Sequence, residues 1–212
     1  MNAALLVVAV IVVGWFAAGS IANVRKGHAA MRWLQGGLPV LGERTTVRWV
    51  GTTSVGLNIA RAQPPFEQVA LVVFLAPRDV PWLWALASRR GRRDALIVRA
   101  QLERAPADDV ELLDRTSWSG RDAGRRLASQ RWSVREPHSP GDLTALYKYE
   151  RALALGDELL SIARDAGVAV RRLATHHDQP HLEIHVDLPQ APVSAGDFCA
   201  ALRSIAERAS RS

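Results

Sequence analysis

The sequence predicts an α+β protein in which one N-terminal transmembrane helix precedes a mainly antiparallel sheet packed with helices. Three observations support this fold class. Residues 3–22 form an uncharged apolar run, short segments with strand-like apolar patterns recur between residues 45 and 134, and two capped segments of helical periodicity follow residue 139.

The apolar run is long enough for a membrane span. At about 1.5 Å per residue, some 20 helical residues cross a hydrocarbon core about 30 Å thick. A cleaved secretory signal is the alternative, because small residues recur near Ala17 and Ala22. A signal normally carries positive charge before its apolar run. Here Arg25, Lys26 and Arg32 follow the run, so we expect an uncleaved anchor.

The same three basic residues are expected to set the topology. By the positive-inside rule, the flank that carries Arg25, Lys26 and Arg32 stays in the cytoplasm. The prediction is therefore a single-pass protein of the cell membrane, with its N-terminus outside and its domain in the cytoplasm.

The chain divides into three expected parts. Residues 1–24 form the anchor, residues 25–43 form a juxtamembrane amphipathic segment and linker, and residues 44–212 form the globular domain, with a candidate subdivision near 116–131. Three apolar side chains of the juxtamembrane segment are expected near the lipid headgroups: Met31, Trp33 and Leu34.

Strands dominate the first half of the domain. Alternating apolar residues predict strands at 45–51 and 55–59, and a continuous apolar run at 69–75 predicts a central strand covered on both faces. Further strands are expected at 95–104 and 110–113. Antiparallel pairing through short turns is the simplest way to connect them.

The second half changes character. An arginine-rich, weakly helical stretch opens at Ser119. A strand is expected around Trp132 and Val134. Ser139 is then expected to cap a long helix that ends at Gly167. A hairpin of residues 168–174 and 181–188 and a helix capped by Ser194 complete the chain. The resulting order from Trp132 is β-α-β-β-α, which resembles an incomplete ferredoxin-like arrangement and implies no particular activity.

Composition restricts the function classes only broadly. The 212 residues, 48% of them hydrophobic, can form a substantial core, and the net charge of +6 favours anionic partners. The single cysteine, Cys199, excludes an intramolecular disulfide and a cysteine-based zinc site, and its apolar helical neighbourhood predicts a packing role. The common phosphate-loop, zinc-protease, nucleophile-elbow and dinucleotide-binding motifs are absent from the sequence.

A histidine-rich hairpin is the strongest candidate for chemistry. The segment HHDQPHLEIHVD places His181, Glu183, His185 and Asp187 on one strand face, with His176, His177 and Asp178 at the turn. Such groups can bind zinc, but alternate strand residues lie about 6.6 to 7 Å apart, too far for same-face histidines to share an ion. We therefore expect no metal and no cofactor. The polar set should face water, paired with Arg171 or Arg172.

A tryptophan- and arginine-rich segment is the candidate membrane-contact site. Residues 81–94 have the composition of an interfacial segment, with indoles suited to headgroup depth and guanidinium groups suited to anionic phosphate. Its candidate contact residues are Trp82, Trp84, Arg89, Arg90, Arg92 and Arg93. The alternative is a short core-packing helix followed by a solvated turn. Nucleic-acid binding is disfavoured, because no recognisable module organises these arginines.

Together these features favour a bitopic protein whose cytoplasmic domain is a non-catalytic binding, assembly or regulatory module at the membrane surface. Its expected partner is the lipid bilayer, in particular anionic headgroups, and an additional protein partner is left open. The alternative is a membrane-tethered enzyme, such as a metal-dependent hydrolase that uses hairpin residues 176–187.

Overall fold

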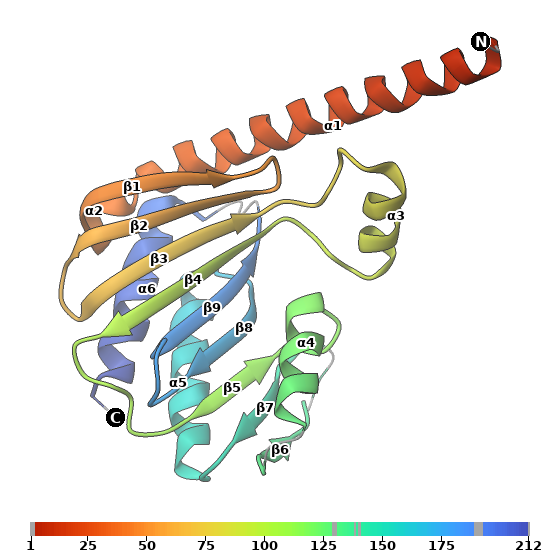
Figure 1. The fold of residues 1–212 in the computed structure, drawn as a ribbon. Coiled ribbons are helices and arrows are strands. Elements are labelled where there is room, and N and C mark those ends of the chain that lie inside the picture. The colour runs from red at the N-terminus through yellow and green to blue at the C-terminus, as the bar shows by residue number, and fades with distance from the viewer. Residues whose placement is uncertain (1–2, 129–130, 138, 140, 189–192, 212) are drawn as a thin grey trace.

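The structure is a computed structural model that describes residues 3–128, 131–137, 139, 141–188 and 193–211. Its centre is one nine-stranded sheet with the order β1-β2-β3-β4-β9-β8-β5-β7-β6, in which every neighbouring pair is antiparallel (Figure 1). An apolar N-terminal helix precedes this sheet. The α+β class and the mainly antiparallel sheet are therefore confirmed.

Helix α1 (Ala3–Gln35) has two halves with different surroundings. It is long and apolar enough to cross a membrane, and every residue from Ala3 to Ala18 is exposed. From Gly19 onward the helix packs against the domain. Its buried residues recur every three or four positions and form a single stripe: Gly19, Asn23, Gly27, Met31 and Leu34.

The segment expected to be a juxtamembrane linker belongs to the domain core. Helix α1 continues to Gln35, the short helix α2 (Leu38–Leu41) follows, and β1 begins at Gly42. Leu34 and Leu41 are fully buried, and the Trp33 ring packs against Phe198 at 5.4 Å between centroids. Met31, Trp33 and Leu34 are thus not at the headgroups, because the last turns of α1 pack on α2 and the C-terminal helix instead of on lipid.

The first four strands form a meander. β1 (Gly42–Val50), β2 (Ser54–Ala62), β3 (Phe66–Phe74) and β4 (Ala95–Leu102) pair in sequence order, as expected from their apolar patterns. β3 differs from its prediction in one respect. Val69, Leu71 and Val73 are fully buried, whereas the alternate residues Ala70 and Val72 are half-buried, so only one face is fully covered.

The second half contains a strand where a helix was expected. Residues 144–147 form β7 (Thr144–Tyr147), which pairs with β5 (Val110–Leu113) and β6 (Ser133–Arg135). Helix α5 (Arg151–Asp165) therefore begins later than the predicted cap at Ser139. The spacing of Leu143 and Leu146 fits a helix. Leu146 lies in β7 between β5 and β6, however, and Leu143 directly precedes this strand, so ladder pairing overrides that local preference.

The expected helix ends are mostly present. Gly167 follows α5 with φ of 71°, and the Ser194 hydroxyl accepts a hydrogen bond from the Asp197 amide at 3.1 Å, which caps α6 (Ala195–Ala209). Helix α4 (Trp118–Leu127) is capped by Ser117 instead of Ser119, because the Ser117 hydroxyl accepts from the Gly120 amide.

The ferredoxin-like order is not observed. β7 and β8 (Val170–Thr175) are connected through α5 and run in the same direction, because each is antiparallel to β5 between them. In a ferredoxin-like arrangement the hairpin partner of β8 would occupy that place. Here the partner β9 (Leu182–Asp187) lies on the other side of β8 and joins it to β4.

The helices cover the sheet unequally. α5 and α6 pack side by side on one face and enclose the main core, while α4 lies on the opposite face over β5 and β8 (Figure 1). A smaller apolar cluster lies beneath α4: Leu113, Ala123, Leu127 and Leu146. The end of the sheet from which α1 departs carries a further helix, α3 (Pro81–Arg89).

Candidate functional site

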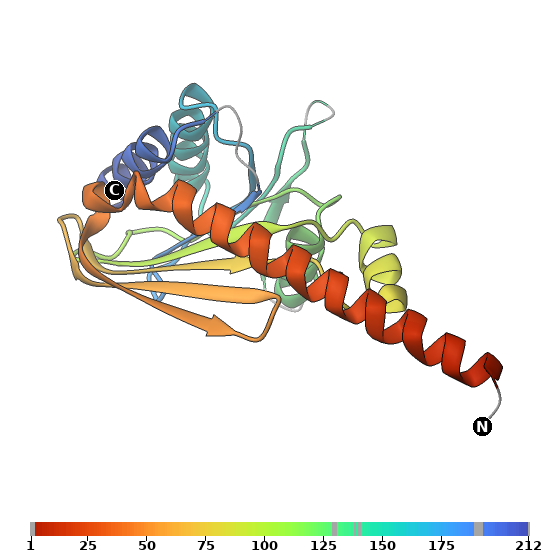
Figure 2. The ribbon, with the colours of Figure 1, turned by 90° about the horizontal axis from the view of Figure 1, so that it is seen from above.

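The loop that leads from β3 to α3 is held tightly against α1 (Figure 2). The Trp15 indole Nε1 donates a hydrogen bond to the carbonyl oxygen of Arg78 at 3.0 Å. A Cβ atom on Gly19 would lie 2.3 Å from the same oxygen, so the backbones can approach this closely only because residue 19 is glycine. The start of α3 is thereby fixed beside α1.

A buried carboxylate strengthens this attachment. The Arg78 guanidinium donates to both oxygens of Asp94 at 2.8 Å and to Asn23 of α1 at 3.2 Å, and Lys26 lies 3.3 Å from Asp94. Burial raises the pKa of Asp94, but hydrogen bonds from Arg78 and the Ala76 amide outweigh it and lower the pKa below its usual value. The charged Asp94 thus joins α1, the loop and the start of β4.

Helix α3 contributes no buried residue to the domain. Trp82 is 70% exposed, and Leu83 and Leu86 are also exposed. At 100° per residue these three side chains lie on one side of the helix, whereas Trp84 points about 200° away from Trp82. The alternative of a core-packing helix is therefore wrong, and the two tryptophans do not share a face.

The four arginines after Leu86 do not act as one group. Arg89, Arg90 and Arg93 are exposed at the end of α3 and in the following turn. Arg92 is half-buried, with its guanidinium 5.6 Å from the centre of the Trp118 ring of α4. The structure therefore leaves three arginines beside the exposed apolar face of α3 and directs the fourth toward the domain.

The height of α3 along α1 follows from the Trp15 contact. The apolar run has 12 residues from Ala3 to Gly14, a rise of about 18 Å, which is less than the roughly 30 Å of a hydrocarbon core. The remaining apolar residues, 15–22, lie beside the loop and the start of α3. A membrane that accommodates the whole run would therefore reach the exposed side chains of α3.

The basic residues expected to set topology follow residues 15–22, the part of α1 that lies beside the start of α3. Arg25 and Arg32 are exposed on α1, and Lys26 is half-exposed and paired with Asp94. None of them is part of the α3 face.

The strand of the histidine-rich hairpin, in contrast, is buried, whereas His177 and Asp178 at its turn are exposed. Residues expected to face water are almost inaccessible, with Glu183 7% and His185 6% exposed. β9 lies in the middle of the sheet, between β4 and β8. Its polar side chains lie among other polar side chains on the sheet face that α4 partly covers. The prediction of a solvated polar face is wrong for this reason.

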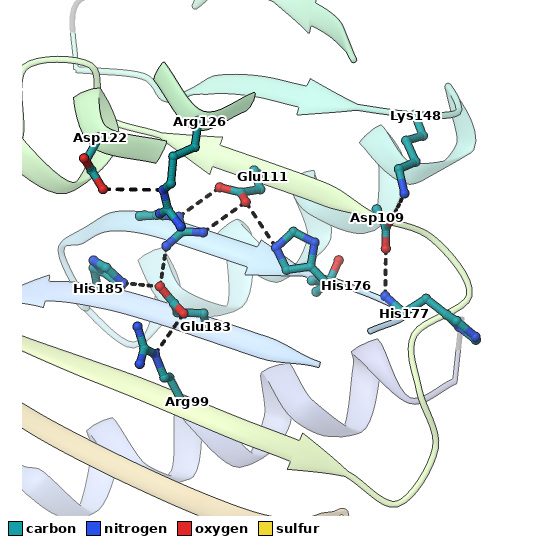
Figure 3. Close-up of polar contacts among 12 residues, drawn as sticks. Arg99, Asp109, Glu111, Asp122, Arg126, Lys148, His176, His177, Glu183 and His185 are labelled. Atoms are coloured by element: carbon teal, nitrogen blue, oxygen red, sulfur yellow. Dashed lines mark hydrogen bonds and ion pairs between the residues drawn. The ribbon is translucent and has the colours of Figure 1, made fainter. Parts of the chain in front are cut away.

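These buried groups form a charge-balanced network (Figure 3). Arg172 binds Glu111 through two hydrogen bonds of 2.9 and 3.0 Å and also pairs with Glu183. Glu183 in turn accepts from Arg99 at 3.0 Å and contacts His185 Nε2 at 2.6 Å. The expected pairing with the neighbouring arginines is confirmed, since Arg172 binds Glu183 and Arg171 binds Asp187.

The network keeps its carboxylates charged and His185 neutral. Burial raises the pKa of Glu183, but the His185 hydrogen bond and the charges of Arg172 and Arg99 outweigh it and lower the pKa to about 2. Burial lowers the pKa of His185, which is neutral at pH 7. Its Nδ1 atom has no hydrogen-bond partner among the described residues.

The histidines of the hairpin serve separate contacts. His181 Nδ1 accepts from the Leu102 amide at 3.0 Å, His176 Nε2 lies 3.1 Å from Glu111, and the His177 amide donates to Asp109 at 2.7 Å. Within the described ranges, no three histidine, cysteine, aspartate or glutamate residues are placed to hold a metal ion. The geometry therefore offers no specific support for the hydrolase alternative.

Sequence reasoning missed the residues that position α3 and those of the adjoining helix α4. Arg78 and Asp94 are far apart in sequence, so no local pattern indicates that they meet. On α4, however, Trp118, Arg121 and Arg125 recur at a spacing of three and four residues, which was a readable sign of one shared face.

Comparison with known proteins identifies no relative: the chain matches no protein-family model, and a search of curated proteins finds none with significant sequence similarity.

Proposed function

We propose that this chain is a single-pass membrane protein whose cytoplasmic domain rests on the lipid surface through α3 and acts there as a non-catalytic binding, assembly or regulatory module. One observation carries the proposal. The hydrogen bond from Trp15 to Arg78, with the close approach at Gly19, fixes the base of α3 beside the apolar part of α1.

The chemistry of α3 suits a membrane interface. An indole at position 82 and leucines at 83 and 86 face away from the domain, and the amphipathic tryptophan ring favours headgroup depth. Arg89, Arg90 and Arg93 can approach anionic phosphate, each contributing roughly 1 kcal/mol near such a surface. Because α1 tethers the domain, even a weak contact is populated at high effective concentration.

The proposed topology follows from the basic residues of α1. Arg25, Lys26 and Arg32 resist translocation, so the domain that follows them stays in the cytoplasm. A reporter active only in the cytoplasm, fused after Ser212, should be active, and neutral substitutions at the three positions should increase the exported fraction. An active export-dependent reporter at the same place would contradict this orientation.

The strands of the hairpin belong to the scaffold of this module, because their charged groups are engaged with one another. The module would present α3 to lipid and leave the rest of its surface available to a protein held at the same membrane.

A nitroxide scan can test the docking directly. Burial raises the pKa of the Cys199 thiol to about 12, so the native cysteine should resist labelling. A single label at Leu86→Cys, in the full chain reconstituted into vesicles with anionic lipid, should collide often with oxygen and rarely with a water-soluble nickel chelate. The control label, Ala107→Cys, lies in the exposed loop after β4 at the opposite end of the sheet and should show the reverse.

Equal access of the nickel chelate to both labels would refute docking through α3. Wild-type protein treated with the same reagent reports any labelling of Cys199.

A further inference from the structure

A pocket of about 450 Å³ lies between the end of α3 and helix α4. Its lining is rich in arginine: Arg90, Trp118, Arg121, Asp122 and Arg125. The pocket is separate from the exposed apolar face of α3, although Arg90 stands at the boundary of the two.

Helix geometry explains why these side chains converge. Four of them come from α4 at positions 118, 121, 122 and 125, a spacing that places them on one face of the helix. The Ser117 cap fixes the start of that helix. The lining is therefore a regular helix face opposed by one residue of the preceding turn.

Arg121 holds the two walls together. Its guanidinium donates to the carbonyl oxygens of Thr116 and Arg90, which ties the first turn of α4 to the turn after α3. Gly91 in that turn has φ of 70°, a conformation that favours glycine and lets the backbone turn toward Thr116. The pocket is thus formed before any ligand arrives, which lowers the entropy cost of binding.

The pocket carries an excess of positive charge. Three arginines face one carboxylate, and Asp122 is shared by Arg125 at 3.5 Å and by Arg126 at 3.4 Å. Within the ranges that the structure describes, the Arg90 guanidinium makes no hydrogen bond or ion pair. An anion would supply the missing partner.

Phosphate is the anion that this lining fits best. The planar guanidinium group matches phosphate oxygens with paired hydrogen bonds, and Arg90 and Arg125 face the pocket from its two walls. Trp118 adds an apolar surface suited to the glycerol or acyl part of a lipid. The pocket also adjoins α3, on the side of the domain from which the apolar half of α1 departs.

We propose that this pocket binds the phosphate of an anionic phospholipid headgroup, with Arg90 and Arg125 as its principal ligands. The lipid source rests on the proposed function, since only a domain docked through α3 brings the pocket to the headgroups. The phosphate chemistry itself rests on the pocket alone.

The test uses the full chain in neutral detergent and a short-chain phosphatidic acid as the probe. In the double variant Arg90→Gln/Arg125→Gln, the affinity measured by calorimetry should fall at least tenfold, because the phosphate loses its charge-assisted hydrogen bonds to two guanidinium groups. Both side chains are exposed, so the thermal midpoint should barely change. Arg121 is left unchanged in this variant, because its guanidinium joins the turn after α3 to the start of α4.

A matched control removes the same charge elsewhere. Arg61 and Arg104 are exposed at the opposite end of the sheet, and the variant Arg61→Gln/Arg104→Gln should bind the probe within about twofold of wild type. Equal losses in both double variants, or no loss in the pocket variant, would overturn the pocket assignment. Equal affinity for inorganic phosphate would overturn the lipid source.

The nitroxide at position 86 separates this inference from the proposed function. A docked label together with unaltered probe binding in the pocket variant would refute the pocket and leave docking intact. A label exposed to water together with pocket-dependent probe binding would refute docking and support a phosphate site.

Discussion

Helix α3 and the sheet face that α4 covers show opposite patterns of burial, and each pattern is the reverse of what the composition of the region predicts. α3 exposes two tryptophans and two leucines, side chains that a domain usually buries. The sheet beneath α4 buries Glu111, Arg172 and Glu183, side chains that a domain usually exposes. Apolar groups are outside in one region, and charges are inside in the other.

The difference shows that the position of a segment in the fold determines whether its side chains are buried, and that composition alone does not. α3 begins at a loop held against α1 and lies outside the core, so its apolar face has no partner within the described chain. β9 lies at the centre of nine strands, so even its polar face is covered. Exposed apolar groups beside a helix long and apolar enough to cross a membrane indicate a binding surface, whereas paired buried charges indicate a structural requirement.

The largest effect should come from removing the central cation of the buried network. Arg172 is 5% exposed and binds both Glu111 and Glu183, so Arg172→Ala leaves two buried carboxylates without their main partner. We expect the free energy of unfolding to fall by about 3 to 5 kcal/mol. Urea titration of the full chain in a fixed detergent measures it.

The neighbouring arginine provides a matched control. Arg171 is 39% exposed and pairs with Asp114 and Asp187, so Arg171→Ala should cost about 1 kcal/mol or less. Similar losses in the two variants would show that burial does not distinguish them. Replacing Arg172, Glu111 and Glu183 together by Met, Leu and Leu should recover part of the loss, since no buried charge is then left unpaired and Arg99, which loses Glu183, is 55% exposed.

An intermediate effect should appear on acidification. The pKa of Glu183 is lowered from 4.5 to about 2 in the folded protein, so the unfolded chain takes up this proton first as the pH falls. Its stabilising contribution is therefore complete above about pH 4.5 and is lost progressively toward pH 2. Other buried carboxylates with lowered pKa values, including Glu111 and Asp94, act in the same direction.

The variant Glu183→Gln isolates this contribution. The difference in unfolding free energy between wild type and variant should be largest above pH 5 and should shrink as the pH falls toward 2, because Glu183 becomes protonated first in the unfolded and then in the folded chain. A difference that stays constant across this range would mean that the charge of Glu183 does not contribute.

The sequence could predict features that depend on local pattern. The apolar run of α1, the first four strands and the Ser194 cap all follow from periodicity or capping chemistry. The buried face of β9 and strand β7 could not be predicted in this way, because both depend on pairing with strands distant in sequence. The same holds for the placement of α3, which depends on Arg78 and Asp94 meeting α1.

The smallest effect on stability should come from the most conspicuous exposed residue. Trp82 makes no contribution to the core, so Trp82→Ser should change the free energy of unfolding in detergent by no more than about 0.5 kcal/mol. Trp33→Ser should cost more than about 1 kcal/mol, because that indole packs on Phe198 and donates to the Val193 carbonyl. In anionic vesicles, Trp82→Ser should have the larger effect on membrane contact, because it should expose a nitroxide at position 86 to the aqueous nickel chelate. Trp33→Ser, in a protein that is still folded, should leave the nitroxide shielded. A large loss of stability from Trp82→Ser with unaltered shielding would return α3 to a packing role and remove the contrast between the two regions.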